Sequence, residues 1–256
     1  TIDYGLTQDD GADLRFFAAD GAPLAYDIEA WDELGDSYVW VKVPQITALS
    51  NSDTITMYWG NAAATSGENA SAVWSNGYAA VHHLHDDFND AAAQRNTADN
   101  QGSADVVGQV GDGQLFDGAD DSISLGNDAS LQDIFDGGGT VSAWVYVDGW
   151  GESGYGRIFD KSGGTTPSAS LPGWALELFG SQQALLFQVA FDGGLGQWAT
   201  GAGSITLDAW NYVSLTYDSS SAANAPVIYI NDQLQTLDPV YTTAPSGSVL
   251  SDAVYD

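Results

Sequence analysis

Five aspartates in two acidic turns are the residues of this sequence best suited to bind a cation. Asp87 and Asp90 follow an apolar run, and Asp117, Asp120 and Asp121 lie within five residues of one another around a glycine. Carboxylates at this spacing repel one another unless water or a cation separates them, and calcium binds carboxylate oxygens together with backbone carbonyls and water. We expect a structural calcium at some of these residues; a solvated acidic turn without an ion is the simpler alternative.

Three aromatic residues outside the clearly alternating segments have the chemistry to bind sugars, because aromatic rings stack on pyranose faces. Trp150 and Tyr155 lie in a glycine-rich stretch at 148–156, and Trp198 lies in a stretch at 192–201 that we interpret as a loop. Loops at sheet ends often carry function, so these three are the candidate ligand-binding residues. The alternative is that they fold back over the core. Trp144 and Trp210 fit strand alternation, and we expect them in the core.

Residues that would support catalysis are sparse. A glycosidase needs two carboxylates at a set separation, and the five glutamates of the chain form no Glu-x-Asp-x-x-Glu run. The sequence also contains no Gly-x-Ser-x-Gly nucleophile turn and no glycine loop ending in Gly-Lys-Ser or Gly-Lys-Thr. We therefore expect that the protein is not an enzyme, and a divergent glycoside hydrolase is the less favoured alternative.

The charge of the chain limits the classes of partner. Thirty-five acidic residues face five basic ones, which gives a formal net charge of −30 over 256 residues. Such a surface argues against nucleic acid and anionic membranes as partners, and it concentrates divalent cations. No stretch reaches the roughly 18 apolar residues of a membrane span, so we expect no membrane insertion. The chain contains no cysteine and therefore no disulfide.

Short apolar alternations punctuated by glycine and aspartate predict an all-β protein. Such segments occur at 24–31, 38–44, 54–61, 140–147, 174–179, 185–191, 210–217 and 227–234. Strands at this spacing indicate an antiparallel β-sandwich or jelly roll. At 113–125, an apolar run, the turn Asp117-Gly118 and a second alternating run predict a β-hairpin that carries three of the five aspartates.

The early segments Asp13-Leu14-Arg15-Phe16, Asp20-Gly21, 26–31, 39–44 and 57–61 occur together in one order. In this order they resemble a bacterial domain of unknown function. The resemblance implies a small β-rich domain at 1–76 whose N-terminal strands are missing, and it implies no established activity. The family commonly precedes a laminin-G-like domain in exported bacterial proteins. Some of these proteins are adhesin-like, and others carry an ExbB/TolQ/MotA-type proton channel segment.

Four later segments, at 115–121, 141–145, 210–217 and 228–232, also occur in a characteristic order. Their order resembles a laminin-G-like, concanavalin A-like jelly roll. The resemblance implies that residues 77–256 form this sandwich with the C-terminal strands missing. It also implies a structural calcium near loops such as the two acidic turns.

Three histidines, His82, His83 and His85, suggest zinc as another metal. His83 and His85 share one face of a strand, and Asp87 would lie within reach of the same ion. The related jelly rolls often carry an aromatic or His-rich opening strand, so the resemblance favours His83 packed within the sandwich.

These observations together predict a non-catalytic recognition module of a large bacterial surface or envelope protein, with an extracellular, cell-surface or periplasmic location. The expected partners are a glycan or a cell-surface protein and the neighbouring domains of a larger protein. The alternative is a structural spacer or docking module, including the periplasmic part of a proton channel protein. The chain opens at Thr1-Ile2-Asp3-Tyr4, so we expect any targeting segment for export to lie outside it.

Overall fold

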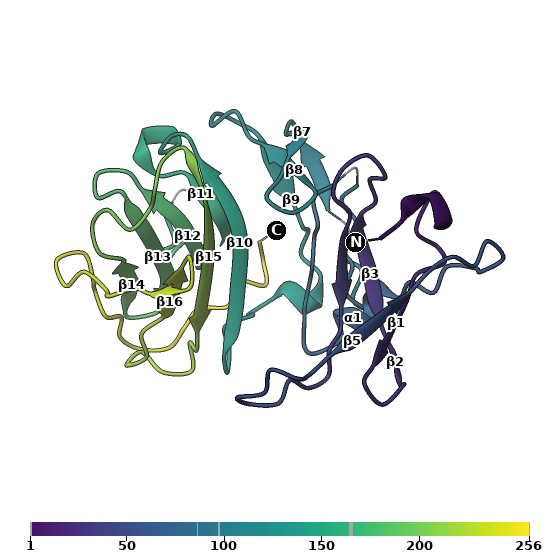
Figure 1. Ribbon diagram of the computed structural model, residues 1–256. Coiled ribbons are helices and arrows are strands. Elements are labelled where there is room, and N and C mark those ends of the chain that lie inside the picture. The colour runs from purple at the N-terminus through teal and green to yellow at the C-terminus, as the bar shows by residue number, and fades with distance from the viewer. Residues whose placement is uncertain (1, 86, 97, 164–165, 256) are drawn as a thin grey trace. The chain divides into compact units, whose positions relative to one another are not determined.

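The computed structural model describes residues 2–85, 87–96, 98–163 and 166–255 and consists mainly of antiparallel strands, as predicted (Figure 1). In chain order the elements are η1 Tyr4–Leu6, β1 Arg15–Ala18, β2 Pro23–Leu24, β3 Tyr26–Ala30, β4 Tyr38–Val41, β5 Ile55–Tyr58, α1 Ala70–Val73, β6 Asp99–Gln101, β7 Ala104–Val107, β8 Asp112–Leu115, β9 Ser122–Ser124, η2 Ala129–Leu131, β10 Gly139–Val147, η3 Glu152–Gly154, β11 Arg157–Ser162, β12 Gly173–Phe179, β13 Ala184–Phe191, β14 Gly194–Ala199, β15 Ala209–Tyr217, β16 Val227–Ile230 and β17 Gln233–Leu234. Among the described residues, the helices are too short to span a bilayer.

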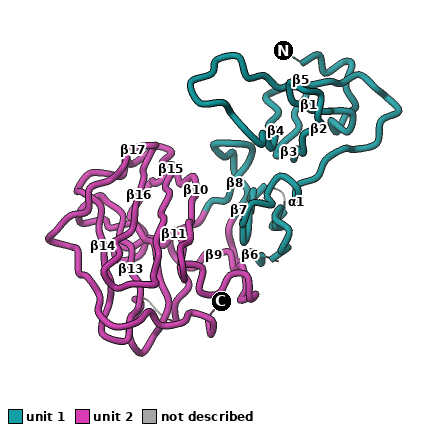
Figure 2. Tube along the Cα trace, turned by 90° about the horizontal axis from the view of Figure 1, so that it is seen from below, with its two compact units in different colours: residues 1–99, 104–115 teal, residues 100–103, 116–256 magenta. Residues whose placement is uncertain are grey.

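The chain forms two compact units, which Figure 2 colours separately. Unit 1 contains residues 1–99 and 104–115, and unit 2 contains residues 100–103 and 116–256. Unit 1 therefore extends past residue 76, the boundary expected from the sequence.

Unit 1 is built from short strands around a small core. Its sheets have the orders β2-β1-β5, β3-β4 and β7-β8. Leu14, Phe16 and Tyr26 form the centre of the core, and the hydroxyl of Tyr26 donates a hydrogen bond to the carbonyl of Leu14 at 2.9 Å. Buried Asp13 accepts hydrogen bonds from the backbone N–H groups of Gln8, Gly60 and Asn61, which joins the segment at 8–13 to the turn after β5.

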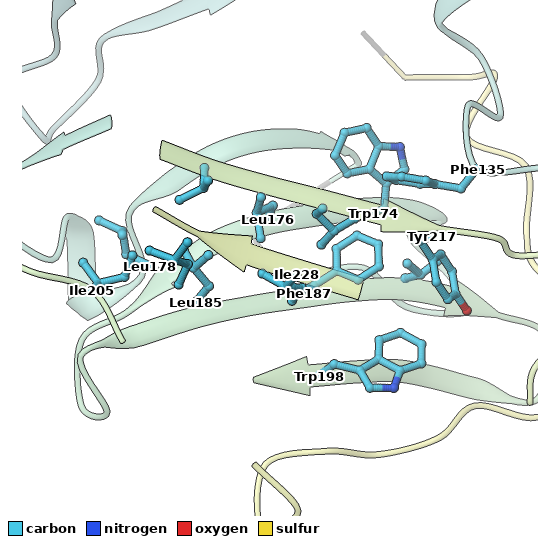
Figure 3. Packing of buried hydrophobic residues seen from close by; sticks show 14 of the residues in the cluster. Phe135, Trp174, Leu176, Leu178, Leu185, Phe187, Trp198, Ile205, Tyr217 and Ile228 are labelled. Carbon is cyan, nitrogen blue, oxygen red and sulfur yellow. The ribbon is translucent and has the colours of Figure 1, made fainter. Parts of the chain in front are cut away.

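Unit 2 is a β-sandwich of two four-stranded sheets. One has the order β10-β15-β16-β17, and the other has the order β11-β12-β13-β14 (Figure 1). Alternate residues of the strands point into the space between the sheets. Figure 3 shows this core, in which Trp174, Phe187 and Tyr217 surround Phe135.

The two central strands of the second sheet are buried on both faces, because every residue of β12 and β13 is buried. Away from the core, Phe179, Ala184, Leu186 and Ala199 form a second cluster against Tyr241. The segment that carries Tyr241 runs along this sheet and forms isolated bridges from Leu237 to Thr200, from Thr243 to Gln197 and from Val249 to Phe191. An extended run of the chain after β17 thus flanks the second sheet.

The prediction of a β-hairpin at 113–125 is wrong. Strand β8 pairs with β7, whereas β9 pairs with β6, so the two runs do not pair with each other. Alternation identifies a strand, but the partner of that strand depends on segments elsewhere in the sequence. The Asp117-Gly118 turn therefore lies between strands of different sheets.

Candidate functional site

Three of the predicted metal-binding aspartates do come together in unit 2. Carboxylate oxygens of Asp117, Asp120 and Asp121 lie within 4.8 Å of one another. Asp121 accepts a hydrogen bond from the backbone N–H of Asp117 at 2.8 Å, and Asp117 accepts one from Ala119 at 2.8 Å. These bonds fix the turn, and the cluster offers the oxygen ligands that calcium prefers.

The other two predicted ligands, Asp87 and Asp90, belong to unit 1 and have local partners. Asp87 accepts hydrogen bonds from the backbone and side-chain amides of Asn89. Asp90 is buried and accepts from the backbone N–H groups of Val81, Ala92 and Asn96 at 2.8–2.9 Å. The geometry assigns Asp90 the role of holding its loop.

The histidines do not form a metal site among the described residues. In the described part of the chain, one group of three or more acidic, histidine or cysteine residues has converging ligand atoms, and it is the aspartate cluster at 117–121. His83 belongs to unit 1, where its ring lies between Asp27 and Glu29. The prediction that His83 packs within the sandwich is therefore wrong.

The three aromatic residues predicted in loops have different environments. Tyr155 is 45% exposed and stacks on Phe179 with ring centroids 5.6 Å apart. Trp150 is half-buried and packs against the core. Trp198 is 2% exposed, because it belongs to β14 and stacks on Phe187 inside the sandwich (Figure 3). The prediction of a ligand-binding loop residue is therefore wrong at Trp198.

The largest group of exposed aromatic side chains in unit 2 lies on the outer face of β10, β15 and β16. Trp144 and Tyr146 on β10 are 44% and 49% exposed, and Tyr229 on β16 is 40% exposed. Across the sheet, Trp144 pairs with Tyr212 and Tyr146 pairs with Trp210. The ring centroids of these pairs are 5.2 and 5.6 Å apart.

The same face is uncharged. The residues of these three strands that point away from the core are five aromatics, four hydroxyl residues and one valine: Trp144, Tyr146, Trp210, Tyr212, Tyr229, Thr140, Ser142, Ser214, Thr216 and Val227. Two of the hydroxyls, those of Thr140 and Thr216, are hydrogen-bonded to each other at 2.8 Å. We call these ten residues the aromatic face.

The expectation that Trp144 and Trp210 lie in the core is wrong, because both belong to the aromatic face. Alternation shows that Trp144 and Tyr146 share one side of β10, but it does not show which side is buried. The smaller residues Val141, Ala143 and Val145 point inward instead. The signal was present in the sequence as a strand with large aromatics on one side and small aliphatics on the other.

Two carboxylates, buried Glu177 on β12 and half-buried Asp160 on β11, lie on the side of these strands that points away from the core. Glu177 is 3% exposed, and burial raises its pKa to about 7 despite the opposing effect of Arg157 on the neighbouring strand. Burial also raises the pKa of Asp160, whose carboxylate pairs with the Arg157 guanidinium at 2.6 Å. Sequence reasoning missed this pair, because the two residues lie on different strands. Glu177 can therefore hold a proton near neutral pH, but it is almost completely enclosed.

Comparison with known protein families gives two matches in sequence order. A domain of unknown function (DUF2341) matches residues 10–100, and the concanavalin A-like lectin/glucanases superfamily matches residues 117–250. The order agrees with the arrangement predicted from the motifs. Comparison with curated proteins and with solved structures gave no significant match.

Proposed function

The chain belongs to the concanavalin A-like lectin/glucanases superfamily, and we propose on this basis that it is a non-catalytic carbohydrate-recognition module that binds neutral glycan on the aromatic face. The superfamily supports a carbohydrate-binding or structural role. The observation that carries the proposal is the set of five aromatic residues on one uncharged face of three adjacent strands.

Aromatic rings and hydroxyl groups are suited to carbohydrate. Rings that remain exposed on a rigid sheet contact an apolar sugar face at low entropic cost, and hydroxyl groups of serine, threonine and tyrosine both donate and accept hydrogen bonds. The net charge of −30 repels acidic polysaccharides, and the uncharged face offers no ion pair to a charged sugar. A neutral glycan is therefore the class of ligand that fits best.

The test is retention of the whole chain on immobilised polysaccharides, both neutral and acidic. We expect retention on at least one neutral polymer and none on polyuronates. The double variant Trp144→Ala, Tyr146→Ala should weaken binding at least about tenfold, because it removes two large stacking groups. Val240→Ala is the control, since it truncates another exposed apolar side chain outside the aromatic face.

The aspartate cluster at 117–121 has the proposed role of a structural calcium site. Three carboxylates close together cost free energy through repulsion, which a bound cation removes. Calcium should therefore raise the melting temperature of unit 2, and a chelator should lower it. Replacing Asp117, Asp120 and Asp121 by asparagine should abolish this response, whereas the exposed control Asp148→Asn should retain it. No response of the wild-type chain to calcium or chelator would contradict the assignment.

A spacer or docking module of a larger envelope protein is the second candidate, which the superfamily match supports equally. It predicts no retention on any polysaccharide and no effect of the variants at residues 144 and 146. Release of reducing sugar from a polysaccharide would overturn both candidates and would direct attention to Asp160 and Glu177. Laminin-G-like domains are typically extracellular, so we propose an extracellular or periplasmic location.

A further inference from the structure

A charge network lies in the interior of unit 1 and is independent of the proposed function. Its centre is the imidazole of His83, whose side chain is 20% exposed. The Nε2 atom of this ring lies 3.0 Å from the Asp27 carboxylate, and the Nδ1 atom contacts the Glu29 carboxylate. Both carboxylates come from β3, two residues apart and therefore on one side of the strand.

This geometry requires a charged ring. A neutral imidazole has one N–H donor and one acceptor nitrogen, so it can satisfy only one of two flanking carboxylates. The imidazolium donates from both nitrogens and thus satisfies Asp27 and Glu29 together. A deprotonated ring would face two anions in a partly buried site with one of its nitrogens directed at a carboxylate as an acceptor.

Two tryptophans hold the carboxylates in place and enclose the ring. The indole N–H of Trp40 donates to Glu29 at 2.6 Å, and that of Trp74 donates to Asp27 at 2.7 Å. The Trp40 ring is stacked on His83 with centroids 6.5 Å apart, and the Trp74 ring is tilted against it at 5.8 Å. The Trp74 ring lies within the range at which an aromatic ring favours a cation over a neutral ring.

No other cation described nearby substitutes for His83. Lys42, which directly follows β4, donates instead to the Ala72 carbonyl and to Asn76. The titratable groups on elements around the network include Glu68 before α1, His82 and His85 in the same segment as His83, Asp90 opposite His82, and Asp112 in the β7–β8 hairpin, which pairs with His85. Two arginines also lie in this part of unit 1: Arg15 donates to the Tyr26 hydroxyl and the Thr65 carbonyl, and Arg95 lines a hollow with Glu68 and Asp90.

We propose that unit 1 is a proton-dependent fold, in which the His83 imidazolium is the internal cation that holds Asp27 and Glu29 together, so that unit 1 loosens at alkaline pH while the sandwich does not.

The direction of the effect follows from the two pKa values of His83. Burial opposes the charged ring, but Asp27 and Glu29 outweigh it and raise the pKa of His83 from 6.5 to about 9. The stabilisation is complete below the unfolded-state pKa and is lost as the pH rises from 6.5 to about 9. Over this range the unfolding equilibrium constant of unit 1 should increase roughly a hundredfold.

At low pH the stability of unit 1 depends on the protonation of its carboxylates. Burial raises the pKa of Asp27, but hydrogen bonds from His83 and Trp74 outweigh it, so the pKa is lowered overall. The stabilisation from Asp27 is therefore present above its unfolded-state pKa and is lost as the pH falls through the lower folded-state value. Burial and the nearby Asp27 raise the pKa of Glu68.

The direct test is a titration of the three histidine side chains of the whole chain by ¹⁵N NMR, with His83 assigned by the variant His83→Gln. We expect the His83 ring to keep both protons well above pH 6.5. A His83 that titrates at or below pH 6.5 would overturn the proposal, and this result needs only the wild-type protein to fold.

The second test is hydrogen exchange followed by mass spectrometry between pH 6.5 and 9, corrected for intrinsic exchange rates. Protection of β3 and β4 should fall roughly a hundredfold, whereas protection of β12 and β13 should not follow it. Glu29→Gln should reduce this pH dependence, and His85→Gln, which changes another histidine of the same unit, should retain it. Equal loss of protection in both units, or none in unit 1, would contradict the proposal.

Discussion

At the scale of single residues, Glu177 illustrates how a strand position sets the ionisation of a side chain. The β12 backbone places it opposite Arg157 and close to Asp160, yet it is almost fully enclosed. Burial raises its pKa from 4.5 to about 7, so the folded state binds the proton more tightly than the unfolded state. Glu177 therefore stabilises unit 2 at low pH, and this stabilisation is lost as the pH rises from 4.5 to about 7.

The variant Glu177→Gln should remove this pH dependence. At pH 8 it should be more stable than the wild type by roughly 3 kcal/mol, because the pKa shift from 4.5 to about 7 corresponds to about 1.4 kcal/mol per unit, and at pH 4 the two should be similar. The measurement is urea unfolding of unit 2 at both pH values. Exposed Glu152→Gln is the control, and a destabilised Glu177→Gln at pH 8 would show that the Arg157 pairing dominates instead.

Residue types could be read from the sequence more reliably than residue environments. The sequence identified five candidate aspartate ligands and left open which of them would converge. Those at 117, 120 and 121 lie together, because five consecutive positions in a turn cannot separate far. Trp144 was predicted in the core and is exposed, whereas Trp198 was predicted in a binding loop and is buried. A tryptophan is compatible with a core and with a binding surface, and its environment depends on which face of its strand meets the second sheet.

At the scale of elements, the start of β12 depends on close packing of backbone against backbone. Gly173 has a φ of +112°, and a Cβ atom there would lie 1.9 Å from the Lys161 carbonyl oxygen on β11. Gly194 at the start of β14 has a φ of +137°, but its Cβ position is open. Both glycines therefore have a φ that is unfavourable for any other residue, but only Gly173 lacks space for a side chain.

This pair gives a controlled test of the β11–β12 contact. Gly194→Ala should cost about 1 kcal/mol of the free energy of unfolding through backbone strain alone. Gly173→Ala should cost more, roughly 3 kcal/mol, because β11 must also move. Chemical denaturation of unit 2 measures both, and equal effects would mean that the strands separate without cost.

The strands themselves were largely predictable, whereas their pairing was not. Alternation predicted strands at 140–147 and 210–217, and these are most of β10 and β15, which pair along nine residues. The run at 113–125 has the same signals, but its two halves pair with β7 and β6. Period-two alternation is a local property, whereas partner choice depends on the burial that the whole sheet achieves.

At the scale of the whole molecule, the excess of acid should make stability depend on salt. Thirty-five acidic residues against five basic ones repel one another, and this repulsion favours expanded states. Raising NaCl from about 0.05 to about 0.3 M screens it, so the urea midpoint of both units should rise. A midpoint that falls with salt would mean that the few ion pairs, such as Arg157 with Asp160, outweigh the general repulsion.

The division into two units separates two kinds of chemistry. Unit 1 encloses a network of charged groups around His83. Unit 2 places uncharged aromatic residues outside, on the sheet formed by β10, β15 and β16. We expect the charge network and the aromatic face to be independent of each other. Alkaline pH should therefore loosen unit 1 without abolishing glycan binding by unit 2.

The most direct measurement of the central claim compares the aromatic face with the exposed loop aromatic. Affinity for one retained neutral polysaccharide should be measured for the wild type, Trp144→Ala, Tyr212→Ala and Tyr155→Ala. The account predicts at least about tenfold weaker binding for the variants at 144 and 212 and unchanged binding for the variant at 155. Binding that depends on Tyr155 and tolerates both changes on the sheet would contradict it.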